Sequence, residues 1–269
     1  MSVKLKKITG ITTVLLFGLT ACTAHPAQQH DQSGGTSATQ QNYDKKTEGG
    51  RNSIRSKDRS IHKTVSSMNQ QGVHVVADPD SIFVLVNKHF KLPDNYVPKQ
   101  LVYPDVPFIS HRSEKSKMRL VAANALTAMF QAAKKDAVQL AGVSAYRSYK
   151  TQSELFNYYV GRDGREKALD YSAEPGTSEH ETGLAIDVSG IDGKYAATPA
   201  FGETPEAAWL AHHAQDYGFI IRYPEGKEAI TGYEYEAWHL RYVGLPTSQT
   251  IVKKGLTLEE YLGAVPVSK

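Results

Sequence analysis

One apolar segment of this chain carries a carboxylate in its middle, and that combination restricts how the segment can fold. Residues 184–188 read Leu-Ala-Ile-Asp-Val, which is typical of a buried strand. Burial of Asp187 is expensive unless its carboxylate is paired or binds a metal. His180 stands seven residues earlier, and Gly183 between them permits a sharp bend. We therefore expect a turn that leads into a strand, with both side chains converging on one ion.

A second motif, about fifty residues later, supplies the remaining groups of a metal site. Glu236 and His239 lie in an aromatic run, residues 233–242, that predicts a strand. The two motifs together offer two imidazoles, one ligating carboxylate and one spare carboxylate. Catalytic zinc needs three such ligands, an open position for water and a general base. Because Glu236 is three residues before His239, a bulge or turn is needed to aim both at one metal.

Each motif has a simpler explanation when it is taken alone. His180 could be a hydrogen-bonded core histidine, and Asp187 could cap a helix or turn. Their joint appearance with the second motif favours the metal site. Five other histidines form no such set and are expected to be solvated or in packing positions: His25, His30, His62, His212 and His213.

Both motifs resemble the signature blocks of a known peptidase family. Residues 178–188 (SEHETGLAIDV) and 236–244 (EAWHLRYVG) are similar to those of the VanY-like zinc D-alanyl-D-alanine carboxypeptidases. The same group includes L,D-carboxypeptidases that trim peptidoglycan tetrapeptides. Further similarity at residues 144–152 and 84–98 extends the resemblance over about residues 80 to 263.

The resemblance assigns roles to individual residues. It implies one zinc ion per chain with three ligands: His180, Asp187 and His239. Glu236 would be the catalytic base, and Arg147 would stabilise the oxyanion of the transition state. Gln152 and Ser178 would help to hold the substrate. A fixed guanidinium at a strand end is independently suited to the charge that develops on an attacked carbonyl.

The expected reaction is hydrolysis that releases the C-terminal D-alanine of a peptidoglycan stem peptide. The sequence leaves open D,D-activity on pentapeptides and L,D-activity on tetrapeptides. One alternative is a cross-bridge endopeptidase, but the lysostaphin-like type resembles an H-x-H ending that is absent after His239. Another is a zinc-structured wall-binding module without catalysis. The spare carboxylate of Glu236 argues against it, since binding alone needs no base.

The N-terminus predicts a location outside the cytoplasm. A lysine-rich start and a short apolar run, residues 8–19, are typical of a signal peptide over residues 1–21. Leu-Thr-Ala-Cys at residues 19–22 resembles the bacterial lipobox, so we expect lipidation of Cys22 and anchoring to the outer face of a bacterial cytoplasmic membrane. The alternative is an ordinary secretory signal. Cys22 is the only cysteine, so it makes no internal disulfide.

Composition divides the rest of the chain into two parts. Residues 22–72, which begin with the lipidated cysteine, are polar and are expected to form a flexible tether with a reach of roughly 40 Å. The formal charge of +3 is carried by the three lysines at positions 4, 6 and 7, so the mature chain is near neutral. No basic face indicates nucleic-acid binding, and the expected partners are stem peptides and, through the anchor, the membrane.

Residues 73–269 are long enough for one domain with one core. Strands are expected at residues 81–87, 138–145, 219–223 and 233–242. Helices are expected at residues 113–135, 151–160, 165–172, 246–254 and 258–262, with another that starts at 204–206 and ends near Gly218. Early long helices and clustered short strands predict an α+β zinc-peptidase domain, with a mostly antiparallel sheet flanked by helices.

Overall fold

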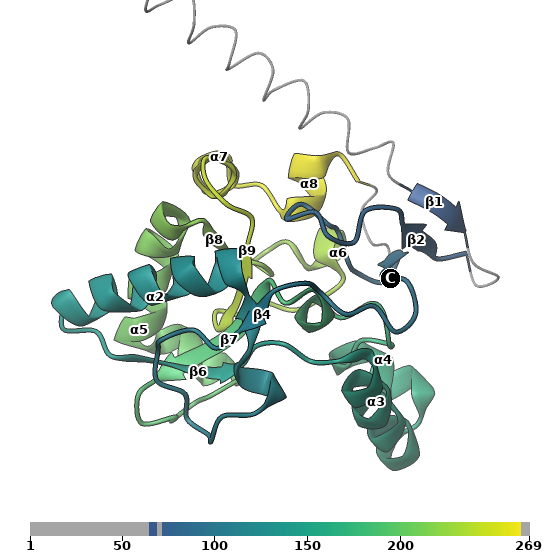
Figure 1. Cartoon of the computed structure of the whole chain (residues 1–269), viewed down its shortest axis with the longest axis horizontal. Coiled ribbons are helices and arrows are strands. Elements are labelled where there is room, and N and C mark those ends of the chain that lie inside the picture. The colour runs from purple at the N-terminus through teal and green to yellow at the C-terminus, as the bar shows by residue number, and fades with distance from the viewer. Residues whose placement is uncertain (1–64, 69–71, 265–269) are drawn as a thin grey trace, which may run out of the picture. The chain divides into compact units, whose positions relative to one another are not determined.

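The computed structural model describes residues 65–68 and 72–264 (Figure 1). The predicted signal peptide and Cys22 lie outside the described residues, as does most of the predicted tether. Strand β1 (Val65–Met68) lies within residues 22–72 and pairs with β2 (His74–Val76), so these four residues take part in a sheet. The sheet also contains β3 (Phe90–Lys91), parallel to β2.

The main sheet has four antiparallel strands in the order β6-β7-β9-β8. They are β6 (Leu140–Ser144), β7 (Ala185–Gly190), β8 (Phe219–Ile221) and β9 (His239–Tyr242). Helices pack beside these strands, as Figure 1 shows. The prediction of an α+β fold with a mostly antiparallel sheet is therefore confirmed.

Side-chain alternation gives the two faces of the sheet different roles. Ile186 of β7 pairs with Leu240 of β9, and both belong to the main hydrophobic core. One position along, Asp187 pairs with His239. Because successive side chains of a strand point to opposite faces, these two polar groups lie on the face away from that core. The apolar positions of the two strands thus place the polar pair on the other face.

Helix α2 (Leu120–Lys135) covers the core face of the sheet. It is joined there by α5 (Pro205–His213), whose N-cap Thr204 accepts a hydrogen bond from the amide of Ala207, as the sequence predicts. The side chains that α2 buries are Ala122, Ala123, Leu126, Met129, Phe130 and Ala133. These side chains belong to the main hydrophobic core, whereas Val121 of the same helix is exposed.

The start of α2 differs from the prediction, in which the helix begins at Ser113. That serine is the N-cap of a short 3-10 helix, η2 (Glu114–Ser116), and α2 begins only at Leu120. The chain between them forms β5 (Met118–Arg119), which pairs with β4 (Leu101–Val102). Pairing with a distant strand interrupts the helix, and local sequence gives no sign of it.

One predicted strand is absent, and the other three are shorter than predicted. Residues 81–86 form no strand, because a side chain takes up two of their backbone acceptors: Arg241 Nη2 donates to the carbonyls of Ile82 and Val84, at 3.1 and 2.7 Å. Asn87 makes only an isolated bridge with Phe90. The aromatic run 233–242 is a strand only in its last four residues, β9.

The remaining helices complete the fold. They are α3 (Tyr149–Asp163), α4 (Arg165–Tyr171), η3 (Glu179–Thr182), η4 (Pro199–Glu203), η5 (Ala214–Tyr217), α6 (Glu228–Thr231), α7 (Thr247–Lys254) and α8 (Leu258–Leu262). Helices α7 and α8 pack on a second core that includes Ile220 of β8 and Val243. Among the helices of the described residues, none is both long enough and apolar enough to cross a membrane.

Candidate active site

The loop before β7 brings His180 back toward the strand. His180 lies in η3, which ends at Gly183 with a left-handed φ of +65°. A side chain at this glycine would also be crowded, because an added Cβ would lie 3.0 Å from a methyl group of Leu101. The bend that the sequence assigns to Gly183 is therefore present, and only glycine adopts it without strain.

Three side chains converge beside the sheet with the geometry of a metal site. One potential ligand atom from each of His180, Asp187 and His239 lies within 4.8 Å of the others, and all three residues are buried. His180 Nε2 is 3.4 Å from one oxygen of Asp187, and His239 Nδ1 is 2.9 Å from the other. Two imidazoles and a carboxylate around one point fit a zinc ion that keeps an open coordination position.

The two histidines present different ring nitrogens to this point. His180 Nδ1 lies 2.7 Å from the carbonyl oxygen of Ala145, which leaves Nε2 facing Asp187. His239 instead directs Nδ1 at Asp187. Burial lowers the pKa of His180. Burial opposes charge on His239 as well, but its contacts with Asp187 and Glu179 raise its pKa to about 10. A metal that binds at Nδ1 must therefore displace a proton.

Glu236 reaches the site through a tight turn. The amide of His239 donates to the carbonyl of Glu236 at 3.2 Å, and Ala237 and Trp238 form the turn between them. This is the turn that the three-residue spacing required if both side chains were to face one metal. Glu236 Oε2 lies 3.9 Å from His239 Nδ1. Burial raises the pKa of Glu236 to about 7. A carboxyl group with such a pKa can accept and return protons near neutrality.

Arg147 belongs to the segment that directly follows β6. Its backbone amide donates to the carbonyl of His180 at 3.2 Å, and its Nη1 donates to Gln152 Oε1 at 2.8 Å. Gln152 is itself held by the carbonyl of Ala173 at 2.6 Å. In the described part of the chain, the buried Nε of Arg147 has no hydrogen-bond partner. Gln152 thus orients a guanidinium that retains unused donor capacity.

A cavity of about 390 Å³ lies over these groups. Its walls include Arg147, Ser178, His180, Asp187, Glu236 and His239, together with Tyr159, Tyr171, Tyr223, Tyr233 and Trp238. Gln152 lies behind Arg147 and is not part of the wall. The structure thus brings together the metal, base, arginine and serine positions that the sequence singled out. It adds an aromatic lining suited to the apolar parts of a peptide.

Sequence reasoning missed a buried ionic cluster behind His239, formed by Glu179, Arg222, Arg241 and Glu259. These four side chains have no solvent exposure. Arg222 and Arg241 each donate to Glu179 Oε1 at 2.7 Å, and Arg222 also forms two bonds to Glu259 of α8, at 2.9 and 2.6 Å. A signal was available, because Arg222 directly follows an apolar strand and Arg241 lies within another.

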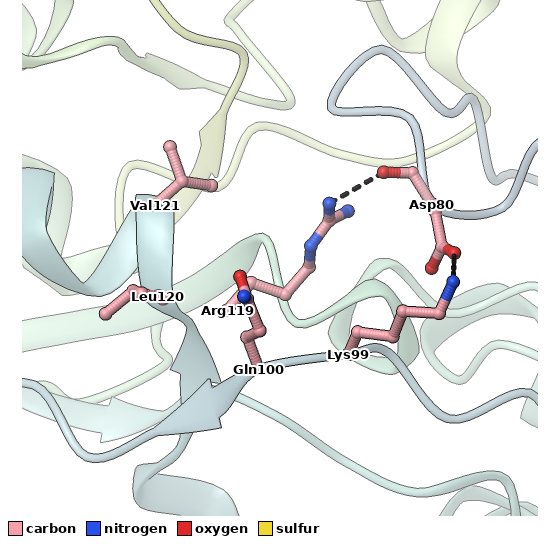
Figure 2. Close-up of a pocket in the computed structure, with 6 residues that line it drawn as sticks. All are labelled: Asp80, Lys99, Gln100, Arg119, Leu120 and Val121. Atoms are coloured by element: carbon pink, nitrogen blue, oxygen red, sulfur yellow. Dashed lines mark hydrogen bonds and ion pairs between the residues drawn. The ribbon is translucent and has the colours of Figure 1, made fainter.

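A second hollow, shown in Figure 2, lies away from these residues at the start of α2. Lys99 and Arg119 point toward Asp80 from two sides. Lys99 pairs with the Asp80 carboxylate at 2.7 Å, and Arg119 donates to the Asp80 carbonyl at 2.6 Å. Both cations at this hollow are thus paired with Asp80.

Known proteins are similar to this chain in sequence and in fold. The sequence profile of the family described as VanY, D-alanyl-D-alanine carboxypeptidase, matches residues 115–245. A putative carboxypeptidase of Bacillus subtilis strain 168, YodJ, is 48% identical over 195 residues, which cover 72% of this chain and 71% of YodJ.

Two solved structures are also similar. The LdcB LD-carboxypeptidase superposes with a TM-score of 0.71 at 46% identity, over 75% of this chain and 94% of LdcB. A variant of the D,D-pentapeptidase VanY from a VanB-type resistance cassette, in complex with Zn(II), has a TM-score of 0.55 at 32% identity. That match covers 67% of this chain and 98% of the VanY chain.

Proposed function

This chain belongs to the VanY family of D-alanyl-D-alanine carboxypeptidases, and on that premise we propose that it removes the C-terminal D-alanine from peptidoglycan stem peptides with a bound zinc ion. The observation that carries the proposal is the arrangement around one cavity. A His/Asp/His cluster lies there with Glu236 and Arg147 beside it. A binding module would need no base at this position.

His180, Asp187 and His239 would hold one zinc ion per chain, as the Zn(II) complex of the similar VanY structure supports. Zinc bound there would supply a Lewis acid and would lower the pKa of a coordinated water. The donor set fits this ion, because nitrogen and carboxylate oxygen are the ligands of catalytic zinc and only three are present.

Glu236 would act as the general base. Its carboxylate takes a proton from the attacking water and later returns it to the amine of the released D-alanine. Its place next to His239 suits this role, since it lies in the cavity wall and its side chain keeps 27% of its exposure to solvent. Ser178, in the same wall, would help to hold the peptide.

Arg147 would stabilise the negative charge that develops on the scissile carbonyl oxygen. Replacing it with lysine keeps the positive charge but removes the planar fork that Gln152 orients. We expect kcat of Arg147→Lys to fall by about 10²- to 10³-fold, the range for a lost oxyanion donor, while zinc content stays unchanged. Steady-state kinetics with metal analysis would measure both. Unchanged kcat would exclude the role.

The activity can be tested with two defined substrates. The purified chain is incubated with a pentapeptide stem ending in D-Ala-D-Ala and with a tetrapeptide stem ending in a single D-alanine, and the products are read by mass. We expect the tetrapeptide to be preferred, because the similarity to the LD-carboxypeptidase exceeds that to the D,D-pentapeptidase. Release of D-alanine from neither substrate would contradict the proposal. Cleavage inside a cross-bridge would favour the endopeptidase alternative.

The proposed location is extracytoplasmic, with residues 1–21 as signal peptide, Cys22 as lipid anchor, residues 22–72 as tether and residues 73–269 as catalytic domain. The lipobox-like residues 19–22 and the cell-wall substrates of the similar proteins support it. We expect Cys22→Ala to release the protein from the membrane fraction or to block its processing. Fractionation and intact mass would test this, and an unchanged distribution and mass would contradict lipidation.

A further inference from the structure

The ionic cluster ends at the metal site. Glu179 uses Oε1 to accept hydrogen bonds from Arg222 and Arg241. Its other oxygen, Oε2, faces His239 Nε2 at 3.5 Å. Within the described residues, both of these facing atoms are buried and neither has a hydrogen-bond partner. His239 Nε2 can donate a hydrogen bond and Glu179 Oε2 can accept one. The two atoms can therefore pair with each other, although their present separation is slightly more than hydrogen-bond distance.

The other ring nitrogen of His239 links this contact to the proposed metal site. Its Nδ1 is the nitrogen that faces Asp187 and the shared metal position, so a metal ligand at that atom must be unprotonated. The proton of the neutral ring must then be on Nε2. Such a proton is fixed when a carboxylate accepts it, and carboxylates that hold metal-ligating histidines in this way tune metal affinity.

We propose that Glu179 is a positioning residue of the metal centre: its Oε2 accepts the Nε2–H of His239, while Arg222 and Arg241 fix the carboxylate through Oε1. This inference rests on the proposed zinc site. The two arginines keep the solvent-excluded carboxylate of Glu179 ionised. Glu179 balances one of their two positive charges, and Glu259, which binds Arg222, balances the other. The cluster is therefore neutral as a whole, which is how four buried charges can be tolerated.

The cluster also connects the metal site to distant segments. Arg241 donates to the carbonyls of Ile82 and Val84, and Asn87 donates to Glu259 Oε1 at 3.0 Å. Segments far apart in the chain thus help to hold the Glu179 carboxylate next to His239, the proposed metal ligand. A purely structural cluster would serve the fold equally well without an oxygen directed at His239, so the position of Oε2 distinguishes the two interpretations.

The test compares two variants of the full chain that make the same chemical change. Glu179→Gln and Glu259→Gln each remove one buried negative charge that Arg222 contacts, but only Glu179 faces His239. Zinc dissociation constants are measured by competition with a chelator, and stability by thermal unfolding of the metal-free forms. We expect both variants to lose stability. Zinc binding should weaken by about 10- to 100-fold in Glu179→Gln and stay near wild type in Glu259→Gln.

Unchanged zinc affinity in Glu179→Gln, or an equal loss in both variants, would overturn the inference. Zinc binding by the wild type is measured first, because its absence would instead refute the proposed function. If Glu179→Gln does not fold, nitrogen NMR of the zinc-loaded wild type with labelled histidine decides the matter. His239 should show a metal-bound Nδ1 and a protonated Nε2, and the opposite arrangement would overturn the role of Glu179.

Discussion

Replacing Glu236 with glutamine should reduce turnover by about two to four orders of magnitude, the range for a lost acid–base group. Glutamine keeps the size and shape of the side chain but cannot take a proton from water. Zinc content should remain near one per chain, because Glu236 lies beside the His/Asp/His cluster and is not counted among its ligands. Release of D-alanine from stem peptides, together with metal analysis, would measure both quantities.

Glu234→Gln is the matched control, since it makes the same change two residues away on an exposed side chain. We expect its turnover to equal that of the wild type. Activity of Glu236→Gln within a few-fold of wild type would defeat the assignment of the base. Loss of zinc from that variant would instead mean that Glu236 is a ligand, and the site would then have four protein ligands.

Removing an imidazole from the cluster should abolish both zinc binding and activity. We expect His180→Ala and His239→Ala to retain little zinc after dialysis, because only two protein ligands would remain in each. Zinc should also stabilise the wild type by mass action, by about 4 kcal/mol when free zinc is a thousand times its dissociation constant. Metal analysis and thermal unfolding with and without zinc would test both expectations.

His212→Ala serves as the control, because this histidine is exposed on α5, outside the cluster. It should keep its zinc and the zinc-dependent rise in unfolding temperature. Full zinc occupancy in His180→Ala and His239→Ala would refute the proposed metal site. A loss in only one of them would reassign the missing ligand to another residue at the cavity.

The core of the site could be predicted from sequence because its residues fall in two short segments, each with a recognisable local pattern. A carboxylate within an apolar strand, a glycine before it and a histidine beyond the glycine are local features. The free-energy cost of burying an unpaired carboxylate and the left-handed conformation that glycine permits both follow from elementary chemistry. The requirement for a turn between Glu236 and His239 was equally local, and the hydrogen bond that closes that turn meets it.

The start of α2 and the segment 81–86 could not be predicted, because in both cases a distant partner changes the local structure. Residues 118–119 pair with β4, and the carbonyls of Ile82 and Val84 accept hydrogen bonds from Arg241. Helix propensity and strand pattern describe what a segment does without such partners. Here backbone groups found better partners far along the chain, which no local window contains.

The residue types and their spacing were enough to predict which side chains come together around the proposed metal position. Which nitrogen of each histidine is available, and which charges stand behind it, depended on contacts between remote segments. Glu179 and Glu259 are 80 residues apart, yet both bind Arg222. A buried charge must find its counter-charge somewhere in the fold, and sequence shows that need without showing which partner the packed structure brings to it.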